Sequence, residues 1–360
     1  MSTFGSPASP DDPALDALCA SIAELAPALE EEGAWPGQQL ALCGNAGVLE
    51  WFIPRRWGGQ EWSEIDLLRA YMRLSAACLT TTFVLTQLTG ACQRIVACGK
   101  EDLQAELLGD LARGTRLATL GISHLTTSRR HLKQPVMRAT LQGDDLILDG
   151  YSPWVTGADR CQFVVTGATL DDGRQVLVVL PTDLEGVSAD EPARLVALSA
   201  SRTARVNCSN VVVDSRWLMA GPVENVMQQG IGGATGGLQT SALALGLSTA
   251  AINMLYDEAT RRAELASAAD ALVRQVQELT AQLLTQAESP RPGGAEQLRT
   301  RANSLALRAT QAALAAVKGA GYVVGHPAGR WCREALFFLV WSCPQGVMAA
   351  NLCELADAGR

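Results

Sequence analysis

The spacing of apolar residues changes twice along the chain, and this change limits the possible folds more than any other feature. Between residues 14 and 29, leucine and isoleucine recur every three or four positions, which is typical of one face of a helix. Asp12 and Pro13 precede this run and predict its capped start. Similar spacing recurs at 65–78, 83–98 and 101–111. Residues 1–117 are therefore predicted to form an N-terminal helical domain.

Short runs rich in β-branched residues follow, and turn residues separate them. Gln-Gly-Asp-Asp at 142–145 and Asp-Asp-Gly-Arg at 171–174 lie between paired runs, which predicts consecutive hairpins. Residues 118–218 are therefore predicted to form an antiparallel sheet or barrel. The runs occupy 136–141, 146–149, 162–168, 175–180 and 205–213.

Helix-forming residues dominate again after the glycine-rich stretch at 230–237. They continue through residue 286 and return at 295–317 and 333–357, with a proline- and glycine-rich connection at 289–294. Long antiparallel helices bury their apolar faces by forming a bundle, which we expect over residues 219–360. The predicted fold class is α+β: N-terminal helices, a central antiparallel β-domain and a C-terminal helical bundle.

Composition excludes several classes of function. Hydrophobic residues make up 48% of the chain, but no uninterrupted apolar run reaches the roughly 20 residues of a membrane helix. The first 13 residues lack the pattern of a secretory signal. A net charge of -8 argues against nucleic acid as a partner. We therefore expect a cytoplasmic protein that binds neither membrane nor nucleic acid.

The cysteines and histidines do not form a recognisable metal-binding pattern. The ten cysteines contain no CxxC pair, and none of the three histidines lies four residues from another. The sequence therefore predicts neither a zinc site nor a disulfide framework, and buried reduced thiols are the simplest interpretation.

Four short stretches together resemble the acyl-CoA dehydrogenase family, which implies the same order of domains. The last stretch matches without gaps, and its Arg333, Glu334 and Ala335 occupy the places of the arginine, acidic residue and alanine that open the family's final helix. The stretches are the proline and double-glycine turn at 53–59, the segment 149–157, the helix from Gly246 to Arg262, and residues 319–335.

The resemblance implies an FAD cofactor and three residues that contact it. Trp154 matches the tryptophan that packs on the flavin ring, and Thr156 matches the threonine at the polar edge of the ring. Arg262 matches an arginine that touches the cofactor's pyrophosphate from a neighbouring subunit. A core tryptophan and a surface arginine are the alternative interpretations. Leu265-Ala266 replaces the family's phenylalanine-glycine pair.

The predicted flavin-binding loop at 122–130 differs more from the family pattern. Ser123 stands where the family has threonine, and Ser128 replaces a family serine after a one-residue gap. Arg129 and Arg130 add positive charge where a phosphate would lie. A solvated turn is the alternative interpretation of this loop.

The family's catalytic glutamate is absent. Counting eight residues from Glu334 gives Ser342, and the position used by a minority of members is Gly236. A neutral hydroxyl without an adjacent base cannot accept a proton near neutral pH. Cys343 is a further candidate, but an inert buried thiol is the simpler interpretation.

Two hypotheses remain open. The first is an FAD-dependent oxidoreductase with non-standard chemistry, such as hydroxylation, on a small molecule or acyl thioester. The second is a catalytically degenerate member that acts as a binding or assembly module. Standard dehydrogenation requires a base from another position. Under either hypothesis, the apolar run at 336–341 predicts a homodimer or homotetramer formed through the C-terminal bundle.

Overall fold

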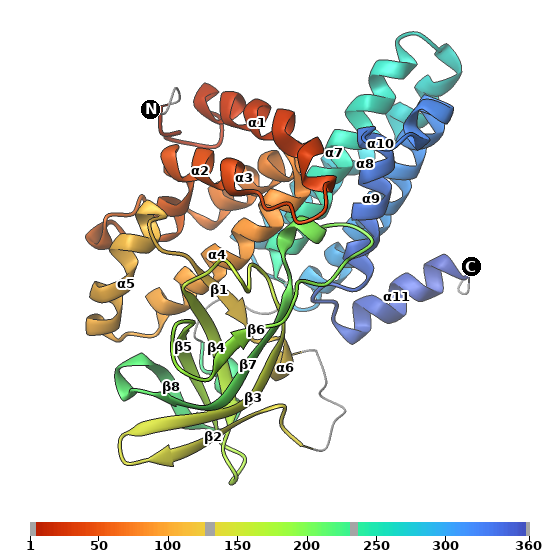
Figure 1. Ribbon diagram of the computed structural model, residues 1–360. Helices are drawn as coiled ribbons and strands as arrows, with labels where there is room; N and C mark the ends of the chain where they lie inside the picture. The colour runs from red at the N-terminus through yellow and green to blue at the C-terminus, as the bar shows by residue number, and fades with distance from the viewer. Residues whose placement is uncertain (1–4, 127–133, 231–236, 358–360) are drawn as a thin grey trace.

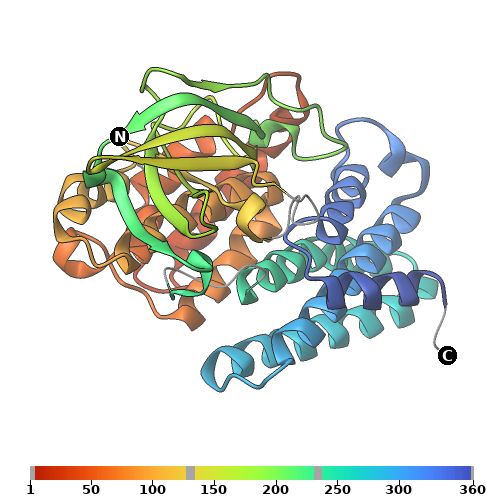
Figure 2. The same ribbon diagram turned by 90° about the horizontal axis from the view of Figure 1, so that it is seen from below.

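The computed structural model describes residues 5–126, 134–230 and 237–357. N-terminal helices, a central sheet and C-terminal helices follow one another along the chain, which confirms the predicted α+β class (Figure 1). In the view from below, the sheet and the N-terminal helices lie together on one side, and the C-terminal helices lie on the other (Figure 2). The division at residues 117 and 218 stays a prediction. Strand β1 begins at Ala118, and strand β8 runs from Leu218 to Val223.

The N-terminal helices begin as the sequence predicts. Asp12 Oδ1 accepts a hydrogen bond from the backbone N–H of Ala14 at 2.9 Å, and Pro13 opens the first helix. Most residues of the fourth helix are buried, because it passes between the sheet and the other helices. The helices are α1 (Pro13–Leu25), α2 (Gly37–Asn45), α3 (Glu64–Ala77), α4 (Leu79–Ala97) and α5 (Glu101–Arg113).

The strands of the described residues form one sheet in the order β6-β7-β3-β2-β4-β5-β8, with β1 paired to β4. The hairpins β2–β3 and β4–β5 are antiparallel, as the turn residues predict. The pairings of β1 and of β2 with β4 are parallel. The strands are β1 (Ala118–Gly121), β2 (Met137–Gln142), β3 (Asp145–Val155), β4 (Phe163–Thr169), β5 (Gln175–Pro181), β6 (Val187–Ala189), β7 (Ala204–Val213) and β8 (Leu218–Val223).

The C-terminal third contains more breaks than the sequence indicated. The helix expected up to residue 286 is two helices, because the backbone is extended at Arg262. The helix expected at 333–357 is broken: α10 ends at Ala335, a 3-10 helix covers Leu336–Leu339, and α11 begins after Pro344, a residue that helix interiors do not accommodate. The last helix leads away from the bundle axis (Figure 1). The helices are α7 (Leu238–Ala259), α8 (Ala266–Glu288), α9 (Gly294–Val317), α10 (Pro327–Ala335) and α11 (Gln345–Leu355), and the short α6 (Ser123–Thr126) follows β1.

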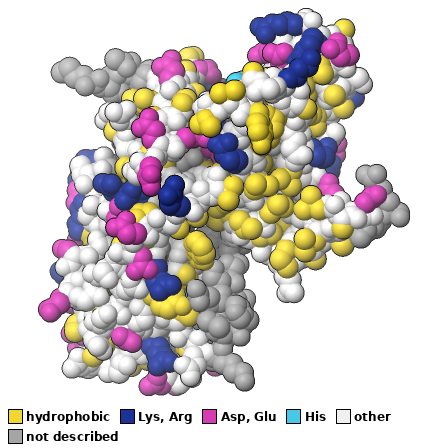
Figure 3. Space-filling model, turned by 45° about the vertical axis from the view of Figure 1, so that its right-hand side comes forward, with side chains coloured by type: hydrophobic (Ala, Val, Ile, Leu, Met, Phe, Trp, Pro, Cys, Tyr) yellow, Lys and Arg dark blue, Asp and Glu magenta, His cyan; other side chains and the backbone are white. Residues whose placement is uncertain are grey.

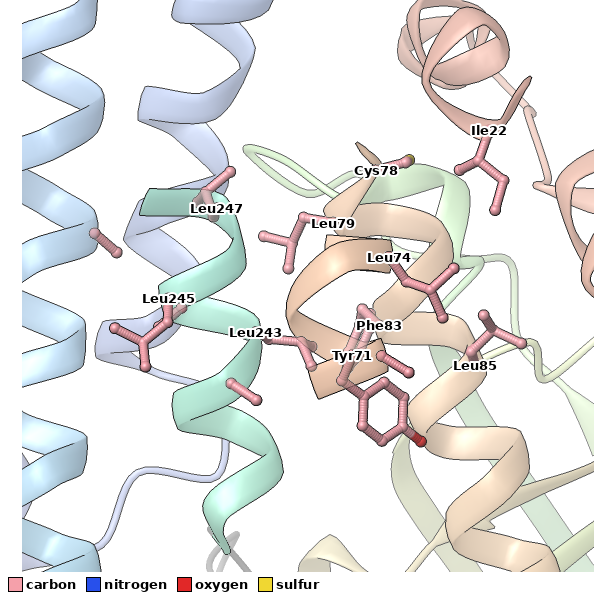
Figure 4. Close-up of a cluster of buried hydrophobic side chains, with 14 of the residues drawn as sticks. Ile22, Tyr71, Leu74, Cys78, Leu79, Phe83, Leu85, Leu243, Leu245 and Leu247 are labelled. Atoms are coloured by element: carbon pink, nitrogen blue, oxygen red, sulfur yellow. The ribbon is translucent and has the colours of Figure 1, made fainter. Parts of the chain in front are cut away.

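Helix α7 joins the two helical parts. Its Leu243 points toward α3 and α4, near Tyr71 and Phe83, whereas Leu245 points toward the C-terminal helices (Figure 4). The contact with α3 is close: Ser75 Oγ donates a hydrogen bond to Leu243 O at 2.7 Å, and a Cβ at Gly246 would lie 2.3 Å from Met72 O. Glycine is therefore required for this helix crossing.

By length and composition, α7 is also the one described helix that could cross a membrane. However, 67% of its most apolar 18-residue window is buried inside the protein, which is typical of a core helix.

Candidate functional site

A cavity of about 920 Å³ lies between the sheet, α4, α7 and the turn after α10. It is large enough for a cofactor or a sizeable substrate. Residues singled out from the sequence line it from both the β-domain and the C-terminal part of the chain. These include Ser123, Trp154, Thr156, Arg333 and Ser342.

One side of the cavity is a single face of α4. The lining residues of this helix recur at helical spacing, and the face changes from aromatic at Phe83 to cationic at Arg94. With a rise of roughly 1.5 Å per residue, these two positions are about 16 Å apart along the helix. The lining residues are Phe83, Thr86, Gln87, Gly90, Gln93 and Arg94.

Trp154 lines the cavity from strand β3. The register of β3 against β7 shifts between Ser152 and Val155, so the strand bulges at this position. Trp154 has a φ of +58°, which is rare for a bulky residue, and its side chain is 57% exposed. Ser123 Oγ donates a hydrogen bond to Pro153 O at 3.0 Å and ties α6 to the bulge. Trp154 is therefore not a core aromatic residue.

Thr156 belongs to a chain of hydroxyl groups behind Trp154. Its Oγ1 lies 3.2 Å from Thr203 Oγ1, which lies 2.8 Å from Ser201 Oγ. Thr119 Oγ1 donates to the carbonyl of Thr156 at 2.8 Å. All four residues are buried, and Thr156 and Thr203 line the cavity. The β-domain thus presents polar groups beside one large aromatic face.

The part of the cavity next to Ser342 is aromatic. Phe83, Phe337 and Trp341 are in mutual contact, with ring centroids 4.8 to 5.1 Å apart. Buried Arg299 donates from Nη2 to Trp341 O at 3.1 Å and supports the turn that carries Ser342. Ser342 itself has a φ of +44°.

Among the described residues that line the cavity, Glu64 at the start of α3 is the only one with a carboxylate. Glu334 lies outside the lining. Its carboxylate accepts a hydrogen bond from Thr80, and burial raises its pKa to about 7. Burial also raises the pKa of the Cys343 thiol, which keeps it neutral. Neither Glu334 nor Cys343 lines the cavity beside Ser342.

Arg262 does not line this cavity. Its Nη2 is 2.7 Å from Glu258 Oε2 and also donates to Ala316 O, so it is held against α7 and α9. A contact with a cofactor bound to a neighbouring subunit stays a prediction. Ser128, Arg129, Arg130 and Gly236 lie outside the described residues.

Sequence reasoning missed Arg94 and the aromatic cluster. A signal for the first was present, because Arg94 is the only charged residue in the nineteen residues of α4. The aromatic cluster gave no local signal, because Phe83 is more than 250 positions from its partners.

The family model for the acyl-CoA dehydrogenase N-terminal domain matches residues 12–115. The chain is 24% identical over 338 residues to the probable acyl-CoA dehydrogenase YngJ of Bacillus subtilis, covering 87% of this chain and 88% of that protein.

Solved structures share the fold over nearly the whole chain. Butyryl-CoA dehydrogenase from Megasphaera elsdenii superimposes with a TM-score of 0.80 at 18% identity, covering 95% of this chain and 97% of that one. FkbI, of methoxymalonyl extender unit biosynthesis, gives 0.82 at 19% identity, covering 96% and 99%. The family model thus identifies an acyl-CoA dehydrogenase N-terminal domain at residues 12–115, and the solved structures show that the whole chain has the acyl-CoA dehydrogenase fold.

Proposed function

We propose that this protein is an FAD-dependent oxidoreductase whose chemistry differs from standard acyl-CoA dehydrogenation. The observation that carries the proposal is that Trp154, Thr156 and Ser342 line one cavity while Ser342 replaces the expected base. The first two residues support a flavin site, and the third argues against the usual reaction.

The residues of the β-domain fit a flavin. The exposed face of Trp154 offers a stacking surface for a planar ring, and its unfavourable φ is understandable if the bulge serves to present the indole. The hydroxyls of Ser123 and Thr156 would bind polar atoms at the ring edge. When bound, a flavin supplies hydride acceptance and, in its reduced form, reaction with oxygen.

The aromatic end of the cavity would shield the reacting atoms from water. Phe83, Phe337 and Trp341 form a continuous apolar surface there. Ser342 can donate or accept a hydrogen bond but cannot hold a proton taken from carbon near neutral pH. A reaction that needs no strong base at this position, such as hydroxylation, fits these groups better than α,β-dehydrogenation.

A catalytically degenerate binding or assembly module is the second candidate. It is favoured by the apolar side chains that α11 and the turn before it expose (Figure 3). We propose that these residues form a homodimer or homotetramer interface under either function. The exposed fractions are 47% for Leu336, 76% for Val340, 45% for Met348, 57% for Leu352 and 62% for Leu355.

The substrate class that we propose is a small molecule or an acyl thioester, and the cytoplasmic location is inferred from the sequence.

Adding FAD to purified apoprotein tests the flavin proposal. We expect flavin absorbance to stay with the protein after desalting and the melting temperature to rise, because a ligand that binds only the folded state stabilises it. If neither occurs, the binding or assembly module is the better description.

A further inference from the structure

Thr240 places a buried hydroxyl group on the wall of the cavity. Its side chain is 4% exposed and lines the cavity from the first turn of α7. Further along this helix, the hydroxyls of Ser248 and Thr249 donate to backbone carbonyls one turn earlier. Thr240 is too close to the start of the helix to have such a carbonyl within α7. Among the described residues, its hydroxyl has no hydrogen-bond partner.

Gln87 of α4 presents a hydrogen-bond acceptor to the same cavity. Its Nε2 donates to Thr86 Oγ1 at 3.0 Å, and the Thr86 hydroxyl in turn donates to Phe83 O at 2.6 Å. These two hydrogen bonds fix the position of the amide. Oε1 of Gln87 is left as an acceptor without a partner among the described residues. Both Thr86 and Gln87 line the cavity.

The two groups come from neighbouring helices. Helices α4 and α7 are in contact, and Leu243 of α7 lies near Phe83 of α4 (Figure 4). Thr240 is three residues before Leu243, and Gln87 is four residues after Phe83, so each lies about one helical turn from this contact. Thr240 and Gln87 therefore line the cavity close to its aromatic part.

Together these groups suit a hydroxyl on the ligand. A threonine hydroxyl can donate or accept a hydrogen bond, whereas an amide oxygen only accepts. One ligand hydroxyl could therefore donate to Gln87 and accept from Thr240. A carboxylate suits the pair less well, because the oxygen of Gln87 would face a negative charge. A plain hydrocarbon chain would displace water from both groups and leave them without partners, which costs binding free energy.

We propose that Thr240 and Gln87 bind a hydroxyl group on the substrate's acyl chain, so that the cavity selects hydroxyacyl over unsubstituted acyl thioesters. This inference rests on the proposed function in taking an acyl thioester as the ligand, with its reacting atoms beside the aromatic part of the cavity. Gln87 is roughly 6 Å from Phe83 along α4, so a hydroxyl within a few carbons of the reacting atoms would reach it.

The sugar-alcohol chain of the flavin is the other source of a hydroxyl. The residues that fit a flavin, Trp154 and Thr156, belong to the β-domain, whereas Thr240 and Gln87 lie on helices beside Phe83. This arrangement favours the substrate as the ligand of the pair, and the experiment below distinguishes the two sources.

The test compares ligands that differ only in a hydroxyl group. FAD-loaded wild type, Thr240→Val and Gln87→Met are titrated with 3-hydroxybutyryl-CoA, 4-hydroxybutyryl-CoA and butyryl-CoA, and binding is followed by flavin absorbance and calorimetry. We expect wild type to bind at least one hydroxyacyl-CoA about tenfold more tightly than butyryl-CoA. Both variants should lose this preference with little change in butyryl-CoA affinity, because a site that hydrogen-bonds a hydroxyl discriminates against the analogue that lacks it.

Two control variants separate binding from folding. Thr310→Val removes an equally buried threonine hydroxyl that does not line the cavity, and we expect it to keep the preference. Thr240→Ser keeps a hydroxyl at the proposed position and should also keep the preference. If Thr240→Val does not fold, Gln87→Met tests the same pair from another helix.

The outcomes are distinct. A preference that survives in a folded Thr240→Val or Gln87→Met, or no preference in wild type for either hydroxyacyl-CoA, overturns the inference. If Thr240→Val weakens FAD binding and leaves the acyl preference intact, the hydroxyl binds the cofactor instead, and the inference is wrong. If FAD does not bind at all, the proposed function fails. The inference then stands only if free 3- or 4-hydroxybutyrate raises the melting temperature of wild-type apoprotein more than butyrate does, and if Thr240→Val abolishes this difference.

Discussion

The hydroxyl of Thr80 donates a hydrogen bond to Oε1 of Glu334 at 3.2 Å, joining the start of α4 to α10 across 254 positions. Glu334 is 2% exposed, and its other oxygen has no hydrogen-bond partner among the described residues. Arg330 Nε lies 3.9 Å from Oε1, which favours the ionised form, but burial has the larger effect on the pKa.

This carboxyl should make stability depend on pH. Its pKa is about 7 in the folded protein against an ordinary value of 4.5, so the folded state binds the proton more tightly. The contribution to stability is complete below about pH 4.5 and is lost as the pH rises to about 7. Over this range the free energy of unfolding should fall by as much as about 3 kcal/mol more in wild type than in Glu334→Gln. Urea denaturation at a series of pH values measures the difference, and parallel curves for the two proteins would contradict it.

Replacing Trp154 should affect cofactor binding more than folding. Because its indole is 57% exposed, Trp154→Ala should cost less than about 1 kcal/mol in the apoprotein, well below the roughly 3 to 5 kcal/mol for a buried tryptophan. The FAD-dependent rise in melting temperature should be lost. Trp51, which is 1% exposed, is the matched control, and Trp51→Ala should show the larger loss of stability. A severely destabilised Trp154→Ala that still responds to FAD would show that the indole is structural.

Introducing the missing carboxylate alone should not restore dehydrogenation. In Ser342→Glu the new side chain would start from a backbone with a φ of +44°, in a turn that Pro344 ends before α11. A catalytic base must be placed within hydrogen-bond reach of the proton it removes. We expect the variant to reduce an artificial electron acceptor with hexanoyl-CoA no faster than wild type. Rapid reduction would show that the turn already has the required geometry.

The exposed leucines of α11 should hold an oligomer together. We expect wild type to have a mass that is a multiple of 38.1 kDa by light scattering at micromolar concentration. Leu352→Glu combined with Leu355→Glu should yield monomers, because charges are unfavourable in an apolar interface. Leu141→Glu introduces one such charge at an exposed leucine of β2 and should leave the mass unchanged. A monomeric wild type would contradict the prediction.

The crossing of α3 and α7 should not tolerate a methyl group. Gly246→Ala would bring a Cβ within 2.3 Å of Met72 O, so the helices must separate, at a cost of roughly 1 to 3 kcal/mol. Gly109→Ala in α5 meets only the flexible end of Arg113 and should gain about 0.5 to 1 kcal/mol. Chemical denaturation measures both. Equal effects in the two variants would mean that α7 can shift without loss.

Structural features that depend on neighbouring residues could be predicted from the sequence, whereas features that depend on packing between distant segments could not. The Asp12 cap and the two predicted hairpins were correct, because each depends on a few neighbouring residues. That Trp154 faces a cleft was expected only from the family resemblance, because its orientation depends on a bulge defined by pairing with β7. The broken last helix could have been anticipated from Pro344. The position of Arg94 on the cavity wall required the packing of α4 against β1.

The aromatic end of the cavity also determines when the site can exist during synthesis. Phe83 is made early, but Phe337 and Trp341, which complete that wall, come more than 250 residues later. A growing chain can form its helices and sheet while this wall is still missing. Any cofactor or substrate that depends on the wall can therefore be held only after Trp341 has left the ribosome, and such a ligand cannot guide the earlier steps of folding.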